Sequence, residues 1–243
     1  MLLAIDVGNT KIKLAVFEHN TLLQKEIAAS SDWKNAVDCI VKNFPNIKNC
    51  VIASVSKLNK EDFIEEIVGI KVFFITRETK FPFQNKYATP NSLGIDRMVL
   101  ACGAVLQFPK KNRLVIDAGT CITYDFIDEK DNYLGGAISP GIRLRYESLH
   151  NYTAKLPLLN KEIPENIIGN STIQSIHSGI VNGVSMEIDG FINSKLHEND
   201  NFIIILTGGD AEFLAKRLKN TIFANSNFLL ESLNQTYQYN HND

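Results

Sequence analysis

The first half of the chain opens with three short apolar runs separated by turn residues. Leu2–Ile5 leads directly into the segment Asp6-Val7-Gly8-Asn9-Thr10, and Ile12–Phe17 and Thr21–Ala29 follow after short connections. Runs of this length, bounded by Gly, Asn and Asp, are typical of strands. The pattern predicts three strands in an antiparallel meander, with the Asp6–Thr10 turn after the first.

Helical and strand-like patterns then alternate through the rest of the first half. Apolar residues from Trp33 to Val41 recur with helical spacing, and Ser31 or Asp32 can cap their helix. The elements expected here are a helix to about Asn43, a strand at Cys50–Val55, a helix at Lys60–Val68, a strand at Lys71–Ile75 and a helix at Pro90–Phe108.

The second half begins the pattern again. The apolar run Arg113–Ile116 ends in Asp117-Ala118-Gly119-Thr120, as the first run ends in its own Asp-containing turn. The elements expected after this turn are strands at Ile122–Ile127, Tyr133–Ile138 and Phe202–Leu206, helices at Ser139–Thr153, Ser171–His197 and Ala211–Leu218, and a polar, frayed tail at Asn234–Asp243. We therefore expect a duplicated α/β domain, residues 1–112 and residues 113–243, with the last helix able to pack back on the first domain.

Composition and charge narrow the class of protein. The 243 residues are 44% hydrophobic and 21% charged, which is ordinary for a globular protein. A net charge of −2 gives no basic excess for nucleic acid. No apolar run reaches the ~20 residues that span a bilayer. We expect a cytoplasmic protein without a nucleic-acid or membrane partner.

The four cysteines show neither a CxxC pair nor a metal-binding cluster with histidine. Cys39, Cys50, Cys102 and Cys121 are expected to be buried free thiols. Cys121 is a candidate for reactivity because it follows the second turn directly.

The Asp6–Thr10 turn has the chemistry of a phosphate contact. Gly8 allows close approach of a ligand, and the turn amides with Asn9 and Thr10 can donate to phosphate oxygens. Asp6 would repel phosphate unless a cation such as Mg²⁺ lies between them. For one such turn an ordinary hairpin is the better interpretation. Its recurrence at Asp117–Thr120 favours a pair of phosphate-binding turns, although the P-loop and Rossmann motifs are both missing.

Three other segments are candidates with competitive structural alternatives. Thr207-Gly208-Gly209-Asp210 could flank a nucleotide, or it is a plain loop with Asp210 as an N-cap. Gly94-Ile95-Asp96-Arg97 could supply a general base and a phosphoryl-stabilising guanidinium, or it is a capping Asp with a surface Arg. Gly135–Gly141 permits close backbone approach, or it is a bulged strand end.

Together these motifs resemble a known group. Two Asp-Gly-Thr turns and a late Thr-Gly-Gly-Asp resemble the acetate and sugar kinase, actin and chaperone ATPase superfamily, and within it type III pantothenate kinase. The segments that carry the closer resemblance are Asp6–Lys13, Gly94–Arg97, Asp117–Thr120, Leu134–Gly141, Thr153–Pro157, Asn170–Thr172 and Ser178–Ile180. The resemblance implies two ribonuclease-H-like (actin-like ATPase) domains with mixed sheets flanked by helices, and an active site in the interdomain cleft.

The resemblance also implies a reaction and roles for residues. ATP would phosphorylate pantothenate to 4′-phosphopantothenate, the first step of coenzyme A synthesis, with Asp96 as general base. Asp117 would bind a monovalent cation, K⁺ or NH₄⁺, and Asp6 would lie near Mg²⁺. Thr172 would come from the second subunit of a homodimer. The ATP contacts would be Asp6, Val7, Gly8, Asn9, Thr10, Lys11, Ile12, Lys13 and Thr120, and the pantothenate contacts Tyr87, Gly94, Ile95, Asp96, Arg97 and Thr172.

Two alternatives stay open at this point. A superfamily kinase acting on a sugar or a carboxylate would share the phosphate turns. A non-catalytic regulator could keep the fold, although the retention of Asp96 and Asp117 argues against it. The chain is also shorter than many family members, with turns rich in Asn and Lys, and Cys121 stands where a smaller residue is expected.

Overall fold

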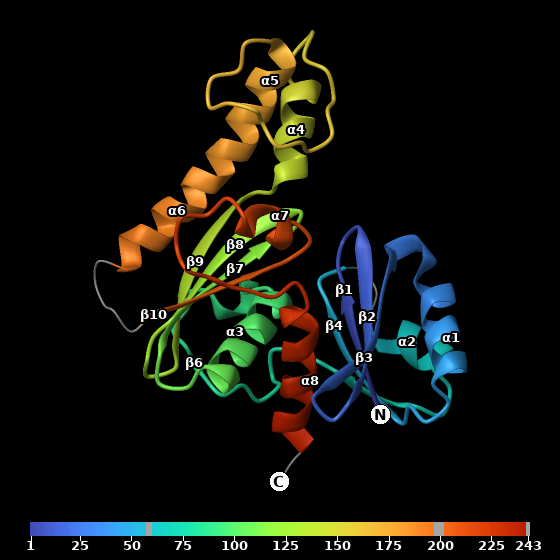
Figure 1. Ribbon diagram of the computed structural model, residues 1–243. Helices are drawn as coiled ribbons and strands as arrows, with labels where there is room; N and C mark the ends of the chain where they lie inside the picture. Colours follow the sequence, from blue (N-terminus) through green and yellow to red (C-terminus); the bar gives the residue numbers. More distant parts are fainter. Residues whose placement is uncertain (57–59, 197–201, 242–243) are drawn as a thin grey trace. The chain divides into compact units, whose positions relative to one another are not determined.

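The computed structural model describes residues 1–56, 60–196 and 202–241. It divides into two compact units. The first unit comprises Met1–Pro109, Asp131–Tyr133 and Asn227–Asp243, and the second comprises Lys110–Lys130 and Leu134–Ser226. Figure 1 labels most of the helices and strands of both.

The first unit is built on a five-stranded sheet with the order β3-β2-β1-β4-β5. β1 (Leu2–Val7), β2 (Lys11–Glu18) and β3 (Thr21–Ala29) are antiparallel neighbours, which confirms the predicted meander. β4 (Asn49–Ser54) and β5 (Lys71–Phe74) extend the sheet on the other side of β1 as parallel strands.

Side chains along β1 alternate between the two faces of the sheet, and each face packs against different helices. Leu3, Ile5 and Val7 belong to a core with α1 (Trp33–Asn43) and α2 (Lys60–Glu66). Because successive side chains of a strand point to opposite faces, Asp6 points away from this core. On that other side of the sheet, α8 (Phe228–His241) packs against β1 and β4, and α3 (Ile95–Gln107) packs against β4 and α8.

The C-terminal residues are helical, so the prediction of a frayed tail from Asn234 was wrong. α8 continues to His241, and Asn242 and Asp243 lie outside the described residues. Asn234 and Thr236 are buried, and the side chain of each makes a hydrogen bond. Asn234 Nδ2 donates to the His19 carbonyl at 2.9 Å, and Thr236 Oγ1 donates to the Ser232 carbonyl at 2.7 Å. Hydrogen bonds thus allow a polar sequence to be buried in a helix.

The second unit repeats the strand order of the first. Its strands follow the order β11-β10-β7-β8-β9, in which β7 and β8 are antiparallel and β10 and β11 are parallel to β7. This equivalence confirms the predicted duplication. The bounds are Asn112–Ala118 for β7, Cys121–Ile127 for β8, Asn132–Pro140 for β9, Phe202–Thr207 for β10 and Phe223–Ala224 for β11. The short β6 (Gln84–Asn85) pairs with Asn132–Tyr133 of β9, within the first unit.

The helices of the second unit share a core with one face of its sheet. α4 (Ile142–Asn151), α5 (Thr172–His177), α6 (Gly183–Leu196) and α7 (Ala211–Ala215) contribute Ile142, Tyr146, Ile176, Ile188 and Leu214 to a cluster with Leu114, Ile116 and Tyr124 of the strands. None of the helices in the described part of the chain is long and apolar enough to cross a membrane.

Several predicted helices differ from the observed ones. The helix predicted from Ser171 is interrupted by a π-helical turn at Ser178–Asn182, and its predicted end at His197 lies outside the described residues. α3 starts at Ile95, because Pro90–Ser92 forms a separate 3₁₀ turn and Gly94 is extended. α7 ends at Ala215, before the predicted Leu218.

The cysteines divide into two pairs. Cys50 and Cys102 are buried, as expected, and burial raises the pKa of the Cys102 thiol to about 12. Cys39 and Cys121 are exposed, so the prediction of burial was wrong for these two.

Candidate active site

Asp6 lies one residue before the end of β1 and faces Lys13 of β2. The two residues are directly opposite in the strand register, and Lys13 Nζ is 3.1 Å from Asp6 Oδ2. Burial raises the pKa of the Asp6 carboxyl. Lys13 opposes this rise in pKa, and the negative charge of Asp96 adds to it. Both of these predicted site residues, Asp6 and Asp96, belong to the first unit.

Some predicted ATP contacts in and beside the turn after β1 have exposed side chains, and others have buried ones. Gly8 N–H donates to the Lys11 carbonyl at 3.0 Å, which closes the turn. Asn9, Thr10 and Lys11 are exposed. The side chains of Val7 and Ile12 are part of the core, so only the backbone of these two predicted ATP contacts is available to a ligand.

The segment Gly94–Arg97 forms the entry to α3. Asp96 lies in the first turn of the helix and its Oδ1 accepts a hydrogen bond from the Arg97 N–H at 2.8 Å. Arg97 is 6% exposed, so the alternative of a surface arginine does not hold. The Arg97 Cζ lies 5.9 Å from the ring centroid of Tyr87, within the range of a cation–π contact. Tyr87, Asp96 and Arg97 thus form one cluster in the first unit.

Asp117 has in β7 the position that Asp6 has in β1. It too lies one residue before the end of its strand, and Gly119 N–H closes the following turn by donating to the Cys121 carbonyl at 3.0 Å. Thr120 is exposed. The residue opposite Asp117 on β8 is Thr123, where the first sheet has Lys13.

At two glycines the backbone lies very close to this second turn. Gly208 has φ +97°, and a Cβ there would lie 2.4 Å from both the Ala118 carbonyl oxygen and Asp117 Oδ1. A Cβ on Gly141 would lie 2.2 Å from the Gly119 carbonyl oxygen. The glycine-rich segments around residues 141 and 208 are therefore close approaches of backbone to the Asp117–Thr120 turn.

The alternative prediction for Asp210, that its side chain caps a helix, was wrong. It occupies the N-cap position of α7, but its side chain makes no capping hydrogen bond. Its Oδ1 instead pairs with Lys161 Nζ.

Thr172 is exposed at the start of α5, where the Oγ of Ser171 accepts from the Gln174 N–H at 3.2 Å. It lines a groove of about 690 Å³ with Asn170 and Ser175. Thr172 belongs to the second unit, whereas Tyr87 and Gly94–Arg97 belong to the first.

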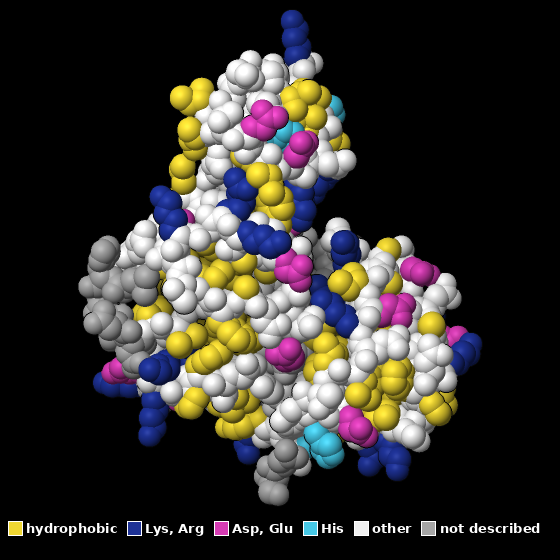
Figure 2. All heavy atoms as spheres, in the orientation of Figure 1, with side chains coloured by type: hydrophobic (Ala, Val, Ile, Leu, Met, Phe, Trp, Pro, Cys, Tyr) yellow, Lys and Arg dark blue, Asp and Glu magenta, His cyan; other side chains and the backbone are white. Residues whose placement is uncertain are grey.

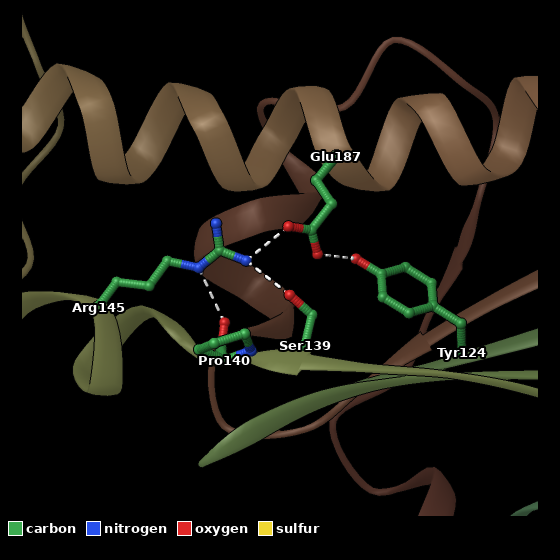
Figure 3. A network of polar contacts seen from close by, with 5 residues as sticks. All are labelled: Tyr124, Ser139, Pro140, Arg145 and Glu187. Carbon is green, nitrogen blue, oxygen red and sulfur yellow. Dashed lines mark hydrogen bonds and ion pairs between the residues drawn. The ribbon is translucent and has the colours of Figure 1, made fainter. Parts of the chain in front are cut away.

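Sequence reasoning missed a polar network beside the second turn, shown in Figure 3. It joins Arg145 of α4, Glu187 of α6, Tyr124 of β8 and the Ser139–Pro140 end of β9. These residues are far apart in the sequence and form no motif, so no sequence signal could have found the network.

Solved structures share this fold. A Sinorhizobium meliloti protein described as a 2-dehydro-3-deoxygalactonokinase superimposes with a TM-score of 0.62 at 11% identity, over 98% of this chain and 99% of that one. A Campylobacter jejuni protein described as a Baf family transcriptional activator gives a TM-score of 0.65 at 23% identity, over 99% and 100% of the two chains. These likenesses show the fold, which is that of sugar kinases and actin-like ATPases, as predicted.

Sequence comparison identifies the family. A family model for type III pantothenate kinase matches residues 2–194. A type III pantothenate kinase from Flavobacterium johnsoniae is 64% identical over 239 residues, which is 98% of each chain. One from Bacteroides fragilis is 36% identical over 242 residues, 99% of this chain and 98% of the relative. The chain therefore belongs to the type III pantothenate kinase family.

Proposed function

We propose that this chain transfers the γ-phosphoryl group of ATP to the primary hydroxyl of pantothenate and forms 4′-phosphopantothenate, the first step of coenzyme A synthesis. The observation that carries the proposal is that a chain matching this family over nearly its whole length has Asp6 and Asp117 at equivalent positions of two similar sheets and Asp96 at the start of α3. A non-catalytic regulator would have no need of these three carboxylates.

Asp96 is the proposed general base. A base must reach the hydroxyl that it deprotonates, and Asp96 is half-buried at the start of α3 rather than locked in the core. The guanidinium of Arg97 and the ring of Tyr87 lie in the same cluster. We assign the pantothenate contacts to Tyr87 and Gly94–Arg97, with Arg97 offsetting the charge of the transferring group.

The proposed ATP contacts are the Asp6–Lys13 turn and Thr120. Phosphoryl transfer needs positioning and charge stabilisation more than covalent chemistry from the protein. Lys13 and the turn amides supply positive and partially positive groups. Asp6 fits a role beside Mg²⁺, because its buried carboxyl has a raised pKa and a nearby cation favours the ionised form. Mg²⁺, when bound with ATP, offsets charge on the phosphates.

Asp117 is the proposed site of a monovalent cation. Lys13 supplies a positive charge to Asp6, but Thr123 stands at the matching position opposite Asp117. The Thr123 Oγ1 is buried and, among the described residues, makes no hydrogen bond. A carboxylate, this hydroxyl and nearby carbonyl oxygens are the ligand types that K⁺ accepts.

We also propose a homodimer in which Thr172 reaches the pantothenate site of the partner. Exposed apolar side chains gather in the α4–α5 region, including Tyr152 at 88% exposed, Ile168 at 81% and Ile167 at 61%. Figure 2 shows yellow hydrophobic groups over this part of the second unit. Exposed apolar patches mark interaction surfaces.

The cytoplasmic location remains a prediction.

The test is ADP release by the purified protein with pantothenate or with a panel of sugars and carboxylates, each with and without K⁺. We expect turnover with pantothenate alone among the acceptors, and more of it with K⁺. Turnover with a sugar and none with pantothenate would replace the proposal with another kinase activity of the same fold.

A further inference from the structure

The peptide group between Pro140 and Gly141 is held from both sides. Its carbonyl oxygen, on Pro140, accepts a hydrogen bond from Arg145 Nε at 2.9 Å. Its N–H, on Gly141, donates to the Thr120 carbonyl at 3.0 Å. In a planar trans peptide these two groups point in opposite directions, so fixing one orients the other. Arg145 is thereby linked to the Asp117–Thr120 turn through a single peptide group.

Arg145 is itself fixed by three acceptors. Beside the Pro140 carbonyl, its Nη2 donates to Ser139 Oγ at 2.8 Å and to Glu187 Oε2 at 2.6 Å. The other carboxylate oxygen of Glu187 accepts from the Tyr124 hydroxyl at 2.8 Å. The side chains of Arg145 and Glu187 are 22% and 25% exposed, and Tyr124 is fully buried. Figure 3 shows the guanidinium between the α6 carboxylate and the end of β9.

Contacts on both sides of the peptide leave it little room to adjust. A Cβ on Gly141 would lie 2.5 Å from the Thr120 carbonyl oxygen, so the backbone here is in direct contact with the turn. The hydrogen bonds on the two sides of the peptide, from Arg145 to the Pro140 carbonyl and from the Gly141 N–H to the Thr120 carbonyl, run in the same direction and polarise one another. A shift of the guanidinium would therefore be passed to Thr120.

We propose that Arg145 is a positioning residue for ATP, which fixes the Asp117–Thr120 turn through the Pro140–Gly141 peptide. Glu187 has the supporting role, because it accepts a hydrogen bond from the guanidinium and so orients it. This inference rests on the proposed function, in which Thr120 contacts ATP. It assigns to Arg145 an effect on nucleotide binding, because Arg145 is linked to Thr120, whereas the proposed pantothenate contacts Tyr87, Asp96 and Arg97 belong to the other unit.

Arg145→Lys is the informative variant. Lysine keeps the positive charge but has no planar fork with which to bind Pro140, Ser139 and Glu187 together. The matched control is Arg143→Lys on the same helix, because Arg143 is exposed and pairs with Glu147 one turn further along that helix, at 2.6 Å. Glu187→Gln is the second variant, which keeps the side-chain shape and leaves Arg145 in the chain.

The measurement is the dissociation constant of a non-hydrolysable ATP analogue by titration calorimetry, with KM for ATP and for pantothenate. Loss of a charged hydrogen bond predicts that Arg145→Lys weakens analogue binding and raises KM for ATP about tenfold. KM for pantothenate should change by less than about threefold, as expected when only one ligand's binding is affected. Glu187→Gln should shift ATP binding in the same direction by less, and Arg143→Lys should match the wild type.

Unchanged analogue binding in both Arg145→Lys and Glu187→Gln, in proteins that are folded at the temperature of the titration, would overturn the inference. So would an equal rise of both KM values in Arg145→Lys. A wild type that binds the analogue but does not phosphorylate pantothenate would refute the proposed function, while the analogue titration would still decide the role of Arg145.

Discussion

Lys13 lies directly opposite Asp6 across β1 and β2, with its ammonium 3.1 Å from the carboxylate. The equivalent pair in the second sheet is Asp117 and Thr123, which are also directly opposite across β7 and β8. Five strands of the second sheet repeat the order of the first, so the two pairs occupy equivalent positions and differ in their side chains. The residue opposite the first carboxylate is a lysine, and the residue opposite the second is a threonine.

This difference predicts that Thr123→Lys reduces the dependence of activity on K⁺. The introduced ammonium can approach Asp117 as Lys13 approaches Asp6, and directly opposite residues of a strand pair have Cβ atoms about 5 Å apart. The measurement is kcat with and without K⁺, with Thr123→Val as the control that removes the hydroxyl and adds no charge. We expect the ratio of the two rates to fall toward one only in Thr123→Lys. An unchanged ratio would argue against a cation at Asp117.

Gly208→Ala should damage the second turn. The positive φ of Gly208 costs an alanine about 1–2 kcal/mol, and its Cβ would collide with Asp117 and the Ala118 carbonyl. We expect a lower melting temperature and weaker ATP binding. Gly209→Ala is the control, since a Cβ at Gly209 meets no atom within 4 Å among the described residues. Its stability should stay within about 0.5 kcal/mol of the wild type. Equal effects of the two substitutions would contradict the close approach.

Glu187 should stabilise the protein at neutral pH and less so in acid. Burial raises the pKa of Glu187, but hydrogen bonds from Arg145, Tyr124 and Ser139 outweigh it and hold the pKa below its usual range. A lowered pKa in the folded state means that the stabilisation is full above the unfolded value of about 4.3 and is lost as the pH falls through the folded value. Glu187→Gln should therefore lower the free energy of unfolding at pH 7 by about 1–2 kcal/mol. In urea titrations at a series of pH values, this difference should shrink below about pH 4. A difference that is independent of pH would refute the pairing.

Mixing two inactive variants tests whether Thr172 acts across a dimer. In a heterodimer of Asp96→Asn and Thr172→Trp, one site would combine the intact Asp96 of one subunit with the intact Thr172 of the other. We expect activity in the mixture after dissociation and reassembly that neither variant has alone. The control mixture, Asp96→Asn with Asp6→Asn, alters two residues of the first unit and should stay inactive. No recovery in the first mixture, with dimers present by light scattering, would place Thr172 in the site of its own subunit.

Local patterns explain why so much of the framework could be predicted. The strands around Asp6 and Asp117 are contiguous apolar runs that end in turn residues, so their positions follow from the sequence alone. The repetition of the two turns then predicted the duplication. The two-residue strands β6 and β11 could not be predicted, because two residues show no periodicity.

Features that depend on tertiary contacts were out of reach. The polar end of α8 is helical because its side chains find partners such as the His19 carbonyl, more than 200 residues away in sequence. The link from Arg145 to Thr120 runs through backbone groups, which carry no sequence signature. The cation–π contact between Tyr87 and Arg97 joins a loop to the start of a helix, and the sequence around Tyr87 contains no motif that predicts it.

The most direct test of the central claim is the turnover of Asp96→Asn with ATP and pantothenate, with the phosphorylated product identified by mass spectrometry. The wild type should form 4′-phosphopantothenate. The variant should lose about 10²–10⁴-fold in kcat, the usual contribution of a general base. Its melting temperature and its affinity for an ATP analogue should match the wild type. A folded Asp96→Asn protein that forms the product at a near wild-type rate would contradict the account.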